Sequence, residues 1–286
     1  MTGKVDVARE LAAFLRTRRE RLAPEDVDLP APRRQRRTPG LRREEVAELA
    51  GVSVDYVTRL EQARGLRPSP EVLDALARAL RLSDDEHVYL FDLTRHWSAA
   101  RRQPSGATDS LARLVQALSP LPAMLVNRRF DILAWNSEMA GLMVDFAGLP
   151  DGQRNTMWLC ALHPAFDNFY RDRERVIREG IADLRAAWAT DPDDAALADL
   201  IGTLNSQSEE FARLWERRDV MVNGQGKKPL LHPKVGPLTI EYDVLTPLGD
   251  SSLRLVVYRA ADAASQKALD RIARDAAEGV PALRAL

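Results

Sequence analysis

Residues 44–61 read EEVAELAGVSVDYVTRLE and contain two short helical patterns that are separated by a turn at Gly51. The apolar spacing predicts one helix before Gly51 and a second helix that begins after Ser53, a favoured N-cap residue. Gly51 permits the left-handed backbone of a tight turn, and Ala47 is small enough for two helices to cross closely. The stretch therefore predicts a helix-turn-helix, with an ordinary structural pair of helices as the alternative.

Three more helices are predicted around this motif. The first ends before Pro24, and the last two begin at Pro70 and after Ser83, where proline and serine are typical of helix starts. The helix that precedes Gly51 should bury Leu49 along with its other apolar residues. Residues 1–97 are thus expected to form an all-α five-helix domain.

A second domain is expected after a linker. Residues 98–109 lose the apolar periodicity and are rich in Ser, Arg, Gln, Pro and Gly, which is typical of a linker. Residues 110–262 mix short strands with helices, an α+β arrangement, and residues 263–286 are expected to form a helical tail. The predicted strands lie at 124–126, 132–135, 238–246 and 253–260, and the predicted helices at 137–146, 172–190, 193–205 and 208–218.

Charge is unevenly distributed along the 286 residues. The net charge is -1, but residues 1–67 hold 15 Lys and Arg against 11 Asp and Glu, and the rest holds 26 against 31. A basic module joined to an acidic body favours a polyanionic partner for the first domain. A single cysteine, the lack of a long apolar run and the lack of a secretory signal predict a cytoplasmic protein without disulfides or membrane insertion.

The second helix of the motif offers side chains that can read DNA, since in a helix-turn-helix this helix enters the major groove. Arg59 can hold a guanine through two hydrogen bonds, and Asp55 can accept from cytosine, orient Arg59 or simply cap the helix dipole. Four loop arginines between Pro32 and Thr38 are predicted to bind phosphates or a narrow minor groove, with a solvated loop as the alternative. The candidate DNA contacts are Arg33, Arg34, Arg36, Arg37, Arg42, Ser53, Val54, Asp55, Tyr56, Thr58 and Arg59.

Four longer stretches resemble MmyB-like transcription regulators. They are LAAFLRTRRERLAPEDVDLP (11–30), RRTPGLRREEVAELAGVSVDYVTRLEQARGLRPSPEVLDALARALRL (36–82), NRRFDILAWN (127–136) and HPKVGPLTIEYDVL (232–245). The resemblance implies an Xre-type helix-turn-helix domain followed by a PAS-like ligand-binding domain, in a transcription regulator associated with antibiotic metabolism whose sensor pocket takes a fatty acid. One departure is Ala63, where the family usually has glycine; nearby Gly65 is a second candidate for the left-handed turn.

Several residues of the second domain are candidates for a ligand pocket. Apolar and aromatic side chains with a few polar groups can line one, although each is also an ordinary core residue. Arg154 and Asn155 adjoin the apolar run 157–162, where they can bind a carboxylate or satisfy a turn and a helix end. The candidate ligand contacts are Arg154, Asn155, Tyr170, Trp135, Met139 and Met143.

No motif in the sequence organises catalysis. The chain has no G-x-S-x-G elbow and no glycine-rich phosphate loop, and its four histidines lack zinc-ligand spacing. Cys160 precedes His163 by three residues on an expected helix, but its apolar neighbours favour burial over reactivity. We therefore expect no enzymatic activity, no catalytic residue, no metal site and no cofactor.

These observations predict a sequence-specific transcription regulator that binds double-stranded operator DNA. A homodimer is expected because two small helix-turn-helix domains read two half-sites with more affinity than one. The second domain is expected to sense a small, lipid-like ligand. The alternative is a DNA-tethered scaffold that dimerises or recruits another protein and binds no small molecule.

Overall fold

The computed structural model describes residues 7–27, 40–64, 68–95, 107–219, 224–248 and 250–278. By their internal contacts, these residues form two compact units. Unit 1 contains the described residues within Met1–Ala100, Arg185–Asp199 and Glu216–Met221, and unit 2 those within Arg101–Leu184, Leu200–Trp215 and Val222–Leu286. Two segments of the predicted second domain thus group with unit 1.

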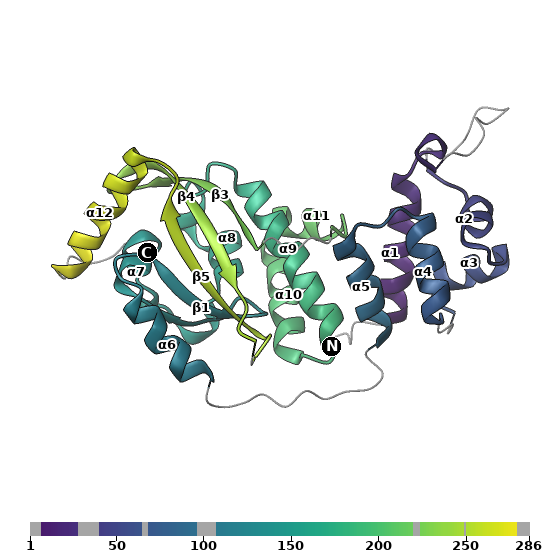
Figure 1. The fold of residues 1–286 in the computed structure, drawn as a ribbon, viewed down its shortest axis with the longest axis horizontal. Coiled ribbons are helices and arrows are strands. Elements are labelled where there is room, and N and C mark those ends of the chain that lie inside the picture. The colour runs from purple at the N-terminus through teal and green to yellow at the C-terminus, as the bar shows by residue number, and fades with distance from the viewer. Residues whose placement is uncertain are drawn as a thin grey trace. The chain divides into compact units, whose positions relative to one another are not determined.

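The secondary structure described up to position 95 consists of helices, as predicted (Figure 1). In chain order the elements are α1 (Val7–Arg21), the 3-10 helix η1 (Pro24–Val27), α2 (Arg43–Ala50), α3 (Val54–Glu61), α4 (Pro70–Ala79) and α5 (Asp84–Arg95). Helix α1 packs against α3 and α5, while α2 packs against α3 and α4. Phe14 and Leu41 are fully buried between them, but Leu49 is 37% exposed. The prediction that α2 buries Leu49 was therefore wrong.

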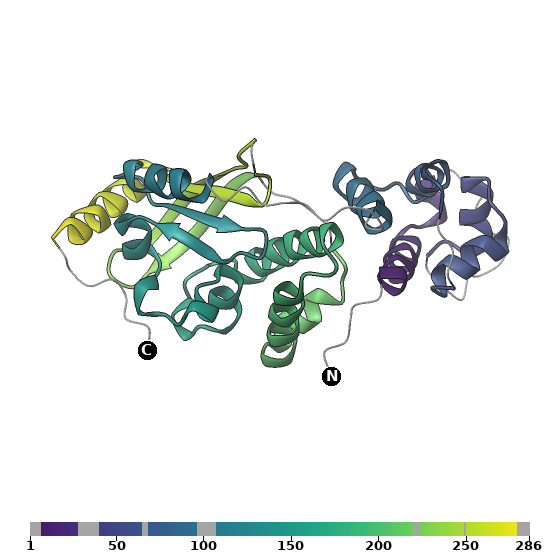
Figure 2. The same ribbon diagram turned by 90° about the horizontal axis from the view of Figure 1, so that it is seen from below.

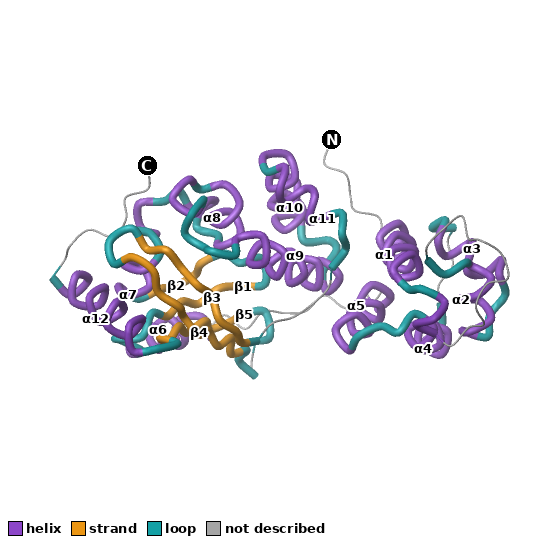
Figure 3. The backbone as a smooth tube through the Cα atoms, turned by 90° about the horizontal axis from the view of Figure 1, so that it is seen from above, coloured by secondary structure: helices purple, strands orange, loops and turns teal. Residues whose placement is uncertain are grey.

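Unit 2 is built on a five-stranded antiparallel sheet of order β2-β1-β5-β4-β3 (Figure 3). The strands are β1 (Ala123–Asn127), β2 (Ile132–Trp135), β3 (Gln225–His232), β4 (Gly236–Leu245) and β5 (Leu253–Ala260). The two central pairings join β1 and β4 to β5, with Leu125 opposite Leu255 and Tyr242 opposite Tyr258. The α+β fold class expected from the sequence is therefore confirmed.

Both faces of this sheet are covered. Alternate residues of each strand point to opposite sides and pack against different helices. Ala123 and Leu125 of β1 pack with Val115 of α6 (Ala107–Ala117) on one face. Met124 and Val126 point to the other face, on whose side α8 (Thr156–Leu162) and α9 (Arg173–Thr190) lie (Figures 2 and 3). The two buried faces explain why β1 and β5 read as nearly continuous apolar runs.

One of the remaining described helices forms much of the predicted C-terminal tail. Helix α12 covers Ala263–Ala277 and packs against α7 and β4, burying Leu269 and Ile272. Helix α6 begins at Ala107, inside the segment predicted as a linker. None of the described helices combines the length and apolarity that a membrane span requires. The other elements are α7 (Ser137–Leu142), α10 (Ala195–Gln207), α11 (Glu209–Trp215) and the 3-10 helices η2 (Phe146–Gly148), η3 (Asp151–Gln153) and η4 (Pro164–Phe166).

Candidate functional site

The turn between α2 and α3 has the geometry that its sequence predicts. Gly51 adopts the left-handed conformation with φ of 65°, and the Val52 amide donates to the Ala47 carbonyl at 3.0 Å to close the end of α2. The Ser53 hydroxyl then accepts from the Tyr56 amide at 3.1 Å, which caps α3. These short-range contacts fix the angle at which α3 leaves the turn.

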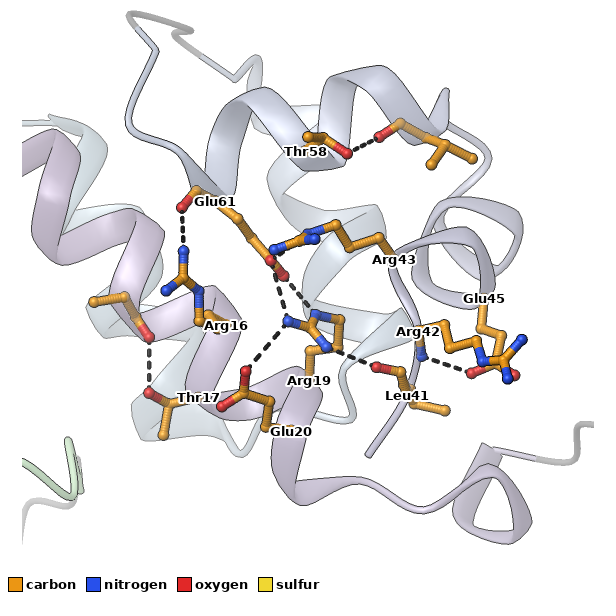
Figure 4. A network of polar contacts seen from close by, with 12 residues as sticks. Arg16, Thr17, Arg19, Glu20, Leu41, Arg42, Arg43, Glu45, Thr58 and Glu61 are labelled. Atoms are coloured by element: carbon orange, nitrogen blue, oxygen red, sulfur yellow. Dashed lines mark hydrogen bonds and ion pairs between the residues drawn. The ribbon is translucent and has the colours of Figure 1, made fainter. Parts of the chain in front are cut away.

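A buried ionic cluster holds α3 against the rest of the unit (Figure 4). The Glu61 side chain is 2% exposed, and Arg19 Nε donates to its Oε1 at 2.6 Å. Arg43 Nε donates to Oε2 at 2.7 Å, and Arg19 Nη1 donates to the Leu41 carbonyl at 2.8 Å. The cluster thus joins α1, α2 and α3 around one carboxylate. Glu61 carries no local signal in the sequence, because its partners lie up to 42 residues away along the chain.

The predicted base-reading residues of α3 differ in how much of each side chain is free. Val54 is 46% exposed, and Asp55 and Arg59 are also exposed. Neither the Asp55 carboxylate nor the Arg59 guanidinium makes a hydrogen bond or ion pair with a residue that the structure describes. Asp55 therefore does not orient Arg59 here. Tyr56 is half-buried, and the Thr58 hydroxyl donates to the Val54 carbonyl at 2.8 Å.

The remaining predicted DNA contacts flank α2. Arg42 stands just before the helix, where its amide donates to the Glu45 carboxylate at 2.7 Å and its exposed side chain lies 3.4 Å from Glu44. Its guanidinium is therefore held only loosely, on the surface. The four loop arginines, Arg33, Arg34, Arg36 and Arg37, lie outside the described residues.

Ala63, the departure from the family pattern, takes the left-handed conformation itself. Its φ is 53°, and the Arg64 amide donates to the Arg59 carbonyl at 3.0 Å to close α3. A side chain with a Cβ is strained there by about 1–2 kcal/mol. The other candidate for this turn, Gly65, lies outside the described residues.

Ala63→Gly is therefore expected to stabilise the protein by about 1 kcal/mol, because glycine adopts this conformation without strain. Thermal unfolding followed by circular dichroism should show a rise in Tm of about 2–4 °C. The control is Ala13→Gly in the middle of α1, which should lower Tm by a similar amount. A lower Tm for Ala63→Gly would contradict the assignment of strain to this turn.

Unit 2 contains a partly open cavity of about 90 Å³ between the sheet and the helices α8 and α9. Helix α9 contributes Val176, Glu179, Gly180 and Asp183, whose spacing places them on one face of the helix. Most of the remaining lining is apolar or aromatic. It comprises Met124, Val126, Phe130, Met143, Thr156, Met157, Cys160, Tyr170, Lys228, Tyr242, Val244, Val256 and Tyr258.

Lys228 places a cation in this apolar lining. Its Nζ lies 4.4 Å from the centre of the Tyr242 ring and 5.9 Å from that of Tyr170, close enough for cation–π attraction. No carboxylate among the described residues lies within ion-pair distance of Nζ. Burial lowers the pKa of the Lys228 amine, since removing water disfavours its charged form.

The two acidic residues of the lining are paired with arginines. Arg175 Nη1 donates to Glu179 at 2.9 Å, and Arg254 Nη1 donates to Asp183 at 2.9 Å. Their negative charges are therefore balanced by arginines, whereas the Lys228 ammonium contacts two aromatic rings and feels Glu179 and Asp183 only from beyond ion-pair distance. An anionic group would be the natural counterpart for Lys228 in such a cavity.

The structure brings two of the six predicted ligand contacts to the cavity. Met143 and Tyr170 line it, and the Tyr170 hydroxyl lies beside Cys160 and Tyr258. Met139, on α7, is fully buried away from the lining. Trp135 is half-buried and packs on Phe146 at 5.4 Å between ring centres.

Arg154 and Asn155, predicted as a carboxylate-binding pair, instead organise a turn outside the lining. Asn155 is 1% exposed, and its oxygen accepts from the Met157 and Trp158 amides at 3.0 Å to cap α8. Arg154 Nε donates to the Phe146 carbonyl at 2.8 Å. The structure thus agrees with the alternative given for this pair, a turn and a helix end.

Cys160 and His163 do not form a reactive pair. Burial raises the pKa of the Cys160 thiol to about 11, so the thiolate is disfavoured at neutral pH. His163 follows the end of α8, and its Nδ1 accepts from the Ala165 amide at 3.2 Å. Within the described residues, no group of three or more His, Cys, Asp or Glu side chains is arranged to hold a metal ion.

A helix-turn-helix whose second helix has an exposed face, in a chain whose other unit holds a mostly apolar cavity, is the layout expected of a DNA-binding regulator with a ligand-binding domain. The family model described as the MmyB-like transcription regulator ligand binding domain matches residues 107–272, and a helix-turn-helix domain model matches residues 10–90. The chain belongs to the MmyB-like transcription regulators. A comparison with curated proteins gives no match.

Proposed function

We propose that this regulator binds operator DNA as a homodimer and that an acidic, lipid-like small molecule in the cavity of unit 2 changes its affinity for DNA. The observation that carries the ligand class is Lys228, a cation in a mostly apolar lining whose two carboxylates are paired with arginines. The proposal places the protein in the cytoplasm, where its DNA is.

The DNA side of the proposal rests on the exposed face of α3. Arg59 is free to reach a guanine, and Val54 and Asp55 are exposed at the start of the same helix, where helix-turn-helix proteins contact base edges. The arginines of 33–37 would bind phosphates beside it. Dimerisation is proposed because operator half-sites repeat at about one turn of DNA, which two symmetric heads can match.

The ligand side rests on the composition and setting of the cavity. The antiparallel five-stranded sheet with helices on its faces supports the PAS-like sensor that the family resemblance implies. The aliphatic part of a ligand would lie on residues such as Val126, Val176 and Val256, and its acidic group would pair with Lys228. Ion pairing with the ligand would offset the cost of keeping the Lys228 charge buried.

Lys228→Met is expected to weaken the binding of straight-chain fatty acids about 10-fold to 150-fold, because a charge-assisted hydrogen bond contributes about 1.5–3 kcal/mol. Isothermal titration calorimetry with hexanoate, octanoate, decanoate and dodecanoate measures this loss. For the wild type, affinity should fall as pH rises, with the loss beginning below about 10, the ordinary range of a lysine amine. The sign follows from Lys228: its pKa is lowered, so the ammonium that attracts the carboxylate is lost below its ordinary range.

Two controls distinguish loss of the Lys228 charge from a general disturbance of the cavity as the cause of weaker fatty-acid binding. Lys227 of the same strand points to the opposite side and pairs with Glu241 at 2.9 Å, so Lys227→Met should leave fatty-acid affinity unchanged. Decanol lacks the acidic group, and its affinity should be the same in the wild type and in Lys228→Met. A wild type that binds none of these fatty acids would contradict the proposed ligand class and favour the scaffold alternative.

A further inference from the structure

Met157 of α8 rests directly on the backbone of α9 at Gly180. A Cβ built at Gly180 would lie 2.1 Å from Met157 Sδ and 2.9 Å from its Cε, far inside van der Waals contact. The thioether therefore occupies the space that the side chain of any other residue at position 180 would fill. Both residues line the cavity, so this contact is part of its wall.

The cavity is small, so the position of the Met157 side chain limits the size of a ligand that fits. The cavity volume is about 90 Å³, whereas an engineered apolar cavity of about 150 Å³ in another protein holds benzene. A medium-length aliphatic chain thus needs a lining side chain to move. Methionine has three rotatable bonds and adapts to irregular space more easily than the β-branched valines of the sheet.

We propose that Met157, seated on Gly180, sets the length of the aliphatic chain that the cavity accepts. This inference rests on the proposed function, since it takes fatty acids as the ligand class. Because Gly180 offers no side chain to hold it, the Met157 thioether can leave its seat when a longer chain enters. The pair therefore determines how much aliphatic chain the cavity can hold.

Calorimetry with hexanoate, octanoate, decanoate and dodecanoate on the full chain tests this inference through two opposite variants. Met157→Ala removes Cγ, Sδ and Cε, so the chain length of highest affinity should increase by about two to three carbons, with about a fourfold gain in affinity for each added methylene that is buried. Gly180→Ala should displace the thioether into the cavity and shift the optimum to shorter acids. Met139→Ala, which removes a buried methionine outside the lining, should leave the optimum unchanged.

The same measurements distinguish a failure of the Met157 role from a failure of the proposed ligand class. If the wild type binds fatty acids but Met157→Ala and Gly180→Ala keep its chain-length optimum, the role of Met157 is overturned and the proposed function stands. If the wild type binds none of the four acids, the proposed ligand class fails, and the inference fails with it. Opposite shifts in the two variants would support both.

Discussion

Glu61→Gln is expected to destabilise the helix-turn-helix by about 3–5 kcal/mol, because it removes the buried counter-charge of Arg19 and leaves only the exposed Glu20 carboxylate at 3.4 Å. The substitution keeps the size of the side chain, so the loss reports on charge and hydrogen bonding. Hydrogen exchange of peptides from α1, α2 and α3, followed by mass spectrometry, should show protection reduced by about two to four orders of magnitude.

Glu44→Gln provides the matched control for this substitution. Glu44 lies on the same helix as Arg43, but it is exposed, and its contact with Arg42 spans 3.4 Å. Surface pairs of this kind contribute less than about 1 kcal/mol, so exchange should be nearly unchanged. Equal protection in Glu61→Gln and Glu44→Gln would show that the buried cluster does not hold α3 in place.

Replacing Arg33, Arg34, Arg36 and Arg37 together by alanine is expected to weaken binding to every DNA sequence. Each phosphate contact that is lost reduces the slope of log affinity against log salt concentration by about 0.9, so the slope should flatten by up to about 3.6. Fluorescence anisotropy with a cognate duplex and a random duplex, over a range of salt concentrations, measures both quantities.

Arg59→Ala is the comparison variant for this experiment. It should cost about 1–3 kcal/mol on the cognate duplex and much less on random DNA, because a base contact carries the sequence preference. A quadruple variant with an unchanged salt slope would remove the loop from the DNA interface. Equal losses on cognate and random duplexes for Arg59→Ala would remove Arg59 from base reading.

The parts of the fold that depend on neighbouring residues could be predicted from the sequence. Gly51 and Ser53 determine the turn and the cap of α3 through contacts within five residues of the chain, and the pairing of β1 with β2 spans a short turn. Strand β3 was missed because it contains Pro229 and two lysines, which disfavour a central strand. It lies at the sheet edge, where proline is tolerated.

The candidate site residues also differ in whether local sequence or contacts between distant segments determine them. Exposure of Arg59 follows from helical spacing alone, since Val57 and Leu60 define the buried side of α3. The cavity could not be predicted, because Lys228 and Tyr170 meet only when β3 is paired and α9 has folded over the sheet. Asn155 was proposed as a ligand contact because an amide beside an apolar run reads equally well as a ligand contact or as a helix cap.

The most direct test of the account is fluorescence anisotropy of the purified protein on DNA upstream of its own gene, with and without decanoate. The account predicts tight, salt-dependent binding that exceeds binding to a random duplex of equal length, and a shift of the binding midpoint when decanoate is added. A midpoint that is identical with and without decanoate, under conditions where calorimetry shows decanoate bound, would contradict the coupling of cavity to DNA. Equal affinity for upstream and random DNA would contradict operator recognition itself.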